Sequence, residues 1–199
     1  RDYRMGVGTF DLLDDYRQAA ALFGERLSLV GDDDWANSTP CDDWDVRSLV
    51  AHLIVGEFLV AALFRGEGGV PIAEVDTSVL GPSPMATWRG TAVGALDAAA
   101  ADGVLDAVHA HHAGDLTGSM IVGFRITDNL VHAWDLARAC GTDIELPEGL
   151  AVRCLDFWLP LAELLTGADA RGRSFAEPVL PPDDSPAGVR LLALLGRGA

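Results

Sequence analysis

The sequence predicts an all-α protein: a four-helix bundle with crossover connections and an extended C-terminal tail that ends in a short helix. Long segments of the chain carry apolar residues at spacings of three and four, which is the period of a helix that packs on a core. Long connections rich in Gly, Pro and Asp separate these segments, as in bundles with crossover loops. Hydrophobic residues make up 49% of the chain and charged residues 22%, the balance of a chain with a full core.

The first two helices are predicted over residues 9–30 and 45–64. Thr9 is a candidate N-cap of the first helix, and the helix is expected to stop before the glycine at position 31. Residues 32–44 contain Asn, Ser, Thr, Pro and several Asp, which favours turns. Asp45 is expected to cap the second helix, whose apolar composition predicts that it is buried.

The third and fourth helices have clear start and stop signals. Ser83 followed by Pro84 at the first helical position predicts the start of the third helix. After the third helix, apolar residues no longer recur at the helical spacing. Residues 104–112 are therefore predicted as either a short strand or an irregular lid. The fourth helix is expected to begin near Ser119 and to end at Gly141, which suits a left-handed C-cap.

A fifth helix is predicted over residues 147–165, with a bend at Pro160. An extended segment rich in Gly, Pro and charge follows, and a last short helix is expected over residues 186–195. We therefore predict two parts, a helical bundle at 1–166 and a C-terminal tail with its short helix, packed on the bundle, at 167–199.

The charge of the chain restricts its partners. Fourteen basic residues, all Arg, stand against 30 acidic ones, so the net charge is −16. Such a chain is not expected to bind nucleic acid by neutralising phosphates, or to bind an anionic membrane surface. The most apolar stretch, residues 49–64, is interrupted by His52 and Glu57 and is shorter than the roughly 20 residues that a membrane span needs.

Cysteine usage favours a reducing compartment. Three cysteines, Cys41, Cys140 and Cys154, form no C-x-x-C pair, so neither a disulfide framework nor a four-thiolate zinc site is encoded. With no signal peptide visible, we expect a cytoplasmic protein. Cys41 is not expected to act as a nucleophile, because the acidic residues beside it oppose thiolate formation.

Two predicted helices carry the candidate site. The fourth helix has polar residues spaced by three, four and three, within an arc of about 80°: Arg125, Asp128, His132 and Asp135. The rest of this helix is apolar around nearly its whole circumference, so the polar stripe is expected to face the interior. Asp128 and His132 are one turn apart, which lets a carboxylate and an imidazole hold one ion. His52, alone in the apolar second helix, needs a buried partner.

If His52 faces Asp128 and His132, the three side chains form a divalent metal site with at least one open position. Open positions are typical of catalytic sites, whereas structural zinc sites are closed. The donor set suits zinc, nickel, cobalt or iron without choosing among them, and we take zinc as the first expectation. The competing interpretation is that His52 bonds a backbone carbonyl or a water in the core, and that the polar stripe is the solvated face of an amphipathic helix.

A rival metal cluster consists of His109, His111 and His112. His109 and His111 would share one face of a strand. The neighbouring Ala and Gly residues instead favour an exposed loop, so we rank this cluster below the site on the two helices.

Two segments resemble a known family. Residues 39–52, TPCDDWDVRSLVAH, and residues 128–141, DNLVHAWDLARACG, resemble the mycothiol-dependent maleylpyruvate isomerase N-terminal-domain group of the DinB-like superfamily. The tail at 171–197 resembles a mainly actinobacterial subgroup of metal-binding proteins. The resemblance implies a DinB-like four-helix bundle with one divalent metal, and it places the ligands at His52, Asp128 and His132.

The resemblance also implies a function. Asp128 stands where the isomerase has Glu, and the matching H-x-W-D-L motif assigns Asp135 a place beside the ligands. We expect a metal enzyme that uses a thiol such as mycothiol to isomerise, or transfer sulfur to, a small electrophile. Asp135 and Arg125 are candidate catalytic residues, either supporting the ligands or facing the substrate.

Two other functions remain open. One is a non-catalytic bundle that binds a small ligand or a partner, with a structural metal or none. The other is metal-assisted hydrolysis with Asp135 as the base. In each case we expect a monomer or a homodimer.

Overall fold

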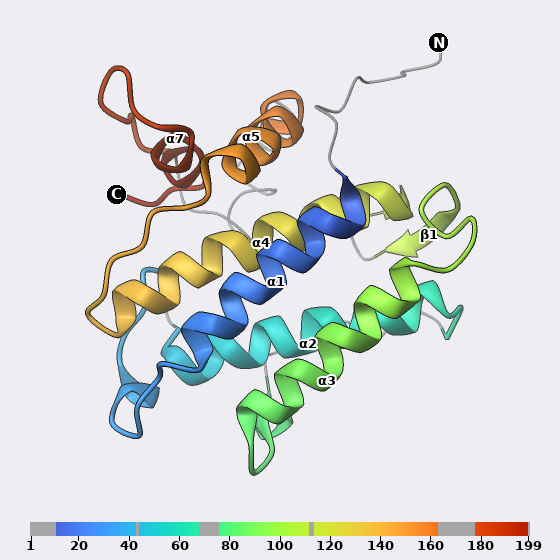
Figure 1. The fold of residues 1–199 in the computed structure, drawn as a ribbon, viewed down its shortest axis with the longest axis horizontal. Helices are drawn as coiled ribbons and strands as arrows, with labels where there is room; N and C mark the ends of the chain where they lie inside the picture. Colours follow the sequence, from blue (N-terminus) through green and yellow to red (C-terminus); the bar gives the residue numbers. More distant parts are fainter. Residues whose placement is uncertain (1–10, 43, 68–75, 112–113, 163–177, 199) are drawn as a thin grey trace. The chain divides into compact units, whose positions relative to one another are not determined.

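The computed structural model describes residues 11–42, 44–67, 76–111, 114–162 and 178–198. These residues are mostly helical, with one two-stranded sheet, so the predicted helical class is confirmed (Figure 1). They divide into two compact units, one from Leu12 to Ile144 and the other made of Asp11 and the described residues from Glu145 onward.

The first unit contains the four long helices. Its elements in chain order are α1 (Leu12–Leu27), η1 (Asp34–Ala36), α2 (Val46–Phe64), η2 (Thr77–Leu80), α3 (Pro84–Ala99), β1 (Val108–His111), β2 (Gly114–Thr117) and α4 (Gly118–Ala139). Within this unit α1 packs against α4 and α3, and α2 packs against α3 and α4 (Figure 1). Phe23 of α1 meets Trp88 of α3 edge to face, with ring centroids 4.7 Å apart. The buried core lies between these helices.

Helix α2 begins where the sequence predicts. The Asp45 side chain accepts a hydrogen bond from the Ser48 backbone N–H at 2.8 Å, which is the expected N-cap contact. By length and composition α2 could span a membrane, but 56% of its most apolar window is buried inside the structure. This burial is what an apolar helix packed against α3 and α4 requires. The predicted cap of α1, Thr9, lies outside the described residues.

A hairpin precedes α4. Strand β1 pairs with β2 in antiparallel register, with Val108 opposite Thr117 and His111 opposite Gly114. The strand alternative for residues 104–112 is therefore confirmed for Val108–His111, whereas β2 was not predicted. Helix α4 follows directly, and Thr117 caps it by accepting from the Met120 N–H. At its far end Gly141 adopts φ +70°, the left-handed conformation predicted from the sequence.

The second unit holds α5 (Glu148–Ala162) and α7 (Ala187–Leu194). Pro160 lies inside α5, as predicted. Both carboxylate oxygens of Glu148 lie 3.2 Å from the Ala187 N–H, which joins the two helix starts. The predicted end of the fifth helix at 165 and the predicted boundary between 166 and 167 lie outside the described residues, so this boundary stays a prediction.

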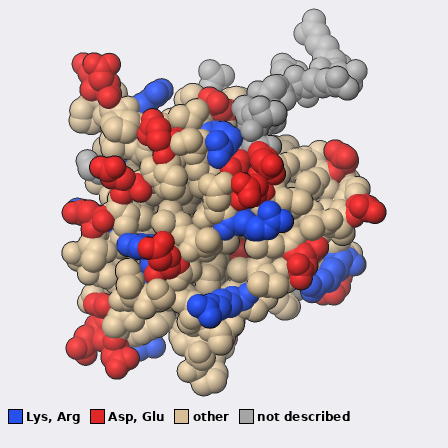
Figure 2. Space-filling view, viewed as in Figure 1, with Lys and Arg blue, Asp and Glu red and all other residues tan. Residues whose placement is uncertain are grey.

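Acidic side chains are spread over the face of the molecule shown in Figure 2, with fewer basic ones between them. This distribution agrees with the net charge of −16.

Candidate metal centre

The structure brings the three predicted ligands together. His52 lies on α2, and Asp128 and His132 lie one turn apart on α4. His52 Nε2 is 3.2 Å from one Asp128 oxygen, and His132 Nε2 is 3.3 Å from the other. One donor atom from each of the three residues lies within 4.8 Å of the others. Segments 76 residues apart in sequence therefore meet at one point.

These distances suit a divalent ion. Nitrogen and oxygen ligands lie about 2.0–2.2 Å from zinc, so neighbouring ligands of a tetrahedral site are about 3.3 Å apart. The two contacts of Asp128 have this length. Two imidazoles and one carboxylate are also a donor set that zinc, nickel, cobalt and iron accept. Three protein ligands would leave a coordination position open.

Asp135 supports His132 from the opposite side of its ring. Its Oδ2 lies 2.8 Å from His132 Nδ1, and its side chain is fully buried. A carboxylate on the far nitrogen of a ligating histidine fixes the tautomer that leaves the other nitrogen free for a metal. The position predicted for Asp135, beside the ligands, agrees with this geometry.

Cys41 lies beside Asp135, on the Nδ1 side of the His132 ring. Its thiol donates to Asp135 Oδ2 at 3.3 Å, and its Sγ lies 3.9 Å from His132 Nδ1. Cys41, His132 and Asp135 are thus a second group of three close donor residues. The 2.8 Å between His132 and Asp135 is an ordinary hydrogen-bond length and is shorter than the separation of neighbouring tetrahedral ligands. We therefore interpret this side as the support of His132, and the Asp128 side as the ligand side.

Arg125 lies on the buried side of Asp128. Its Nη1 donates to Asp128 Oδ2 at 2.5 Å, and its Nη2 donates to Glu57 Oε1 at 2.8 Å. Only 7% of Arg125 is exposed. Of the two roles predicted for this residue, the geometry favours support of a ligand over direct contact with a substrate.

Three residues near the centre were not predicted as part of the site. The Trp44 ring lies 4.7 Å from the His52 ring, Cys41 reaches Asp135, and Glu57 holds Arg125. Trp44 belongs to the same sequence motif as His52, residues 39–52. Glu57 had a signal as well, because it is the second polar residue that interrupts the apolar stretch of α2.

The described histidines of the rival cluster, His109 and His111, make other contacts. His109 Nε2 lies 2.9 Å from the Val104 carbonyl oxygen, and its ring packs on Phe64. The His111 ring lies 6.4 Å from that of Phe124. Among the described residues, neither histidine belongs to a group of three close metal donors. His112 lies outside the described residues.

Burial and charge interactions together shift the pKa values of the three candidate ligands. Burial alone would lower the pKa of His132, but the Asp128 charge and the hydrogen-bond contacts of the imidazole with Asp128, Asp135 and Cys41 raise it well above its usual value. Burial would raise the pKa of Asp128, yet Arg125 and the two histidines hold it well below its usual range. For His52, burial outweighs the effect of Asp128 and lowers the pKa.

These directions predict a stability maximum near pH 6.5 for metal-free protein. Because the pKa of His132 is raised in the folded protein, protonation of His132 stabilises the fold. This contribution is fully present below the unfolded-state pKa of about 6.5 and is lost as pH rises through the folded-state pKa. The lowered His52 pKa removes stability as pH falls below about 6.5, and the lowered Asp128 pKa removes more below about 3.9. Urea unfolding in the presence of a chelator, between pH 2.5 and 9, measures this profile.

The control for the pH profile is His132→Gln, which should flatten the decline above pH 6.5. An equal decline in the variant and the wild type would contradict the assignment of that decline to His132.

Comparison with known proteins identifies related chains. The model of the mycothiol maleylpyruvate isomerase N-terminal domain matches residues 16–137, a range that includes all three candidate ligands. Two uncharacterized proteins, from two strains of Mycobacterium tuberculosis, are each 30% identical over 184 residues, which is 92% of this chain and 95% of theirs.

Solved structures show the same fold. A mycothiol-dependent maleylpyruvate isomerase superposes with a TM-score of 0.70 at 16% identity, over 94% of this chain and 89% of that chain. A histidine-to-alanine mutant of such an isomerase superposes with a TM-score of 0.69 at 15% identity and the same coverage. The helical fold expected from the sequence is therefore shared with this enzyme.

Proposed function

The chain belongs to the mycothiol maleylpyruvate isomerase N-terminal domain family, and on this premise we propose that it is a metal-dependent enzyme using a low-molecular-weight thiol. Mycothiol is the first candidate thiol, and the reaction is isomerisation or S-transfer on a small electrophilic substrate. The observation that carries the proposal is the open group of His52, Asp128 and His132 within the family's fold.

The donor atoms of the site suit this role. His52 Nε2, His132 Nε2 and a carboxylate oxygen of Asp128 would hold the cation, for which zinc is our first choice. When bound, a divalent metal lowers the pKa of a thiol at its open position and so supplies a nucleophile at neutral pH. Asp135 holds the proton on His132 Nδ1 and thereby keeps Nε2 available.

The surroundings of the ligands allow a small molecule to approach. The side chains of His52 and Asp128 are 23% and 26% exposed, whereas those of His132 and Asp135 are almost fully buried. Trp44 covers one face of His52. Because the Cys41 thiol donates to a buried carboxylate, it is not placed to act as the nucleophile, and a thiol from solution fits the site better.

The test is thiol consumption with a panel of small electrophiles that includes maleylpyruvate. Protein loaded with zinc and protein treated with a chelator are each mixed with mycothiol, and free thiol and products are followed. We expect turnover only with the metal-loaded protein, and none with a metal-treated His52→Ala variant. Equal rates with loaded and chelated protein across the panel would contradict the proposal.

A further inference from the structure

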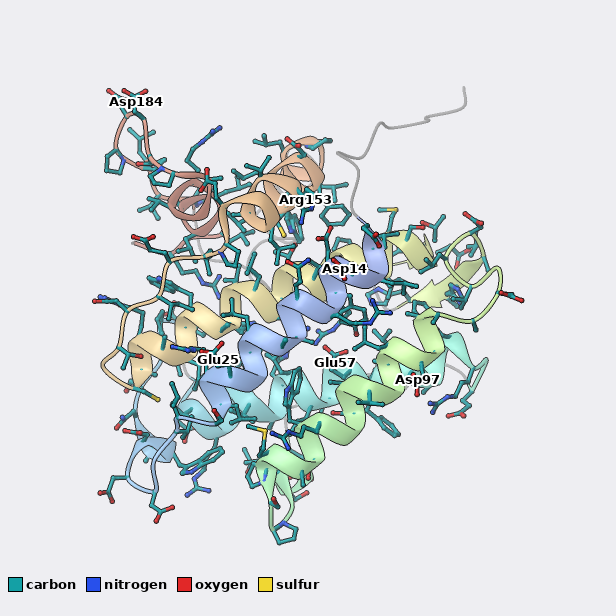
Figure 3. The ribbon with its side chains drawn as sticks, in the orientation of Figure 1. Asp14, Glu25, Glu57, Asp97, Arg153 and Asp184 are labelled. Carbon is teal, nitrogen blue, oxygen red and sulfur yellow. The ribbon has the colours of Figure 1, made fainter. Side chains whose placement is uncertain are left out.

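A buried polar network adjoins the candidate metal centre through Arg125, which contacts Asp128 Oδ2, the carboxylate oxygen that also faces His52. Its centre is Glu57 of α2, which is fully buried and is labelled in Figure 3. The Tyr16 hydroxyl of α1 donates to one Glu57 oxygen. Arg125 and Asn129 of α4 donate to the other, at 2.8 and 2.7 Å. Glu57 therefore ties three helices together.

Arg125 divides its donors unequally between two carboxylates. Both Nε and Nη2 donate to Glu57 Oε1, at 3.3 and 2.8 Å, while Nη1 alone reaches Asp128 Oδ2. The opposite Asp128 oxygen, Oδ1, faces His132. As a result Asp128 makes one contact with the guanidinium and keeps an oxygen toward the ligand side.

The backbone of α2 limits where the guanidinium can lie. A Cβ atom on Gly56 would be 2.5 Å from Arg125 Nη1 and 2.7 Å from its Cζ, so the guanidinium lies flat against this glycine. Glu57 is the next residue and is itself held by Tyr16. Burial and the nearby Glu57 charge raise the pKa of Tyr16 well above its usual value, so its phenol remains a donor.

A buried guanidinium needs an anionic partner. If Glu57 lost its charge, Asp128 would be the remaining carboxylate in contact with Arg125 among the described residues. Arginine and carboxylate readily form two parallel hydrogen bonds, which are among the strongest in proteins. Such a pairing would occupy both Asp128 oxygens and compete with a cation for them.

We propose that Glu57 is a positioning residue of the metal centre: by holding Nε and Nη2 of Arg125, it prevents Arg125 from pairing fully with Asp128 and leaves Asp128 free to bind a cation. This inference rests on the proposed metal site but not on the thiol reaction.

The experiment compares the cobalt affinity of the full chain with that of three variants. Competition with a chromophoric chelator gives the affinity, and the visible absorption of bound Co²⁺ gives its coordination. Glu57→Gln should weaken Co²⁺ binding by about 10–100-fold, the range found for residues that orient ligands. Tyr16→Phe, which removes one hydrogen bond to Glu57 but leaves its charge, should bind Co²⁺ as the wild type does. Both variants should lower the melting temperature.

The third variant separates positioning from mere support of the fold. Combining Glu57→Gln with Arg125→Met removes the Arg125 guanidinium, which would otherwise compete with Co²⁺ for Asp128, together with the Glu57 charge. Co²⁺ affinity should therefore return to within a few-fold of the wild type. Equal affinities for Glu57→Gln and Tyr16→Phe would overturn the inference, and so would failure of the double variant to recover affinity.

The same measurements distinguish this inference from the proposed function. Weakened cobalt binding in Glu57→Gln, together with a wild type that consumes no thiol, would support the positioning role and contradict the enzymatic proposal. Normal thiol turnover with unchanged cobalt affinity in Glu57→Gln would overturn the positioning role alone.

Discussion

Replacing His52 by alanine is expected to weaken zinc binding by at least about 100-fold while the protein remains folded. His52 is the single ligand contributed by α2, and the two remaining ligands on α4 form too small a donor set to hold zinc tightly. Its side chain is 23% exposed, so the space left by truncation opens in part to solvent. Zinc content after dialysis and chelator competition measure the affinity, and circular dichroism with thermal melting checks the fold.

The matched control is His109→Ala, which removes a histidine of strand β1 that contacts the Val104 backbone carbonyl. It should leave zinc affinity unchanged. Wild-type affinity in His52→Ala would show that the ion binds elsewhere. Collapse of the fold in that variant would instead support a structural ion and the non-catalytic alternative.

Asp135→Asn is expected to weaken zinc binding by about 10–100-fold without moving the ligands. The carboxylate of Asp135 accepts a hydrogen bond from the His132 Nδ1–H at 2.8 Å. An amide in its place can donate to Nδ1, which favours the tautomer with its proton on Nε2 and removes the lone pair that binds metal. Zinc competition at constant pH measures the loss, and NMR of the His132 ring nitrogens reports the tautomer.

Asp143→Asn serves as the control for this substitution, because Asp143 is an exposed aspartate that pairs with Arg138 on the surface. It should bind zinc like the wild type. If Asp135→Asn had the same zinc affinity as Asp143→Asn, the carboxylate of Asp135 would have no part in orienting His132.

Much of the fold could be predicted because helix signals are local. Asp45 is an N-cap in the sequence and in the structure, and Gly141 takes the left-handed conformation expected at a helix end. The buried character of α4 also follows from its composition, since apolar residues surround its polar stripe. The need of a buried imidazole for a partner left open whether His52 faces Asp128 and His132, and the family resemblance implied that placement.

Other parts of the site depend on contacts between distant segments. Strand β2 is formed by pairing with β1, and its four residues, GDLT, have no clear strand pattern of their own. The partner of Arg125 could not be chosen from α4 alone, because Glu57 comes from a different helix. Cys41 reaches Asp135 across 94 residues of sequence. Spacing along one helix cannot reveal such partners.

The most direct test of the central claim is a crystal structure of zinc-loaded protein with anomalous diffraction data at the zinc absorption edge. We expect one strong anomalous peak about 2.0–2.2 Å from His52 Nε2, from His132 Nε2 and from an oxygen of Asp128, with a further position open to solvent. A peak between Cys41, His132 Nδ1 and Asp135, a peak at the hairpin histidines, or no peak at all would contradict the claim.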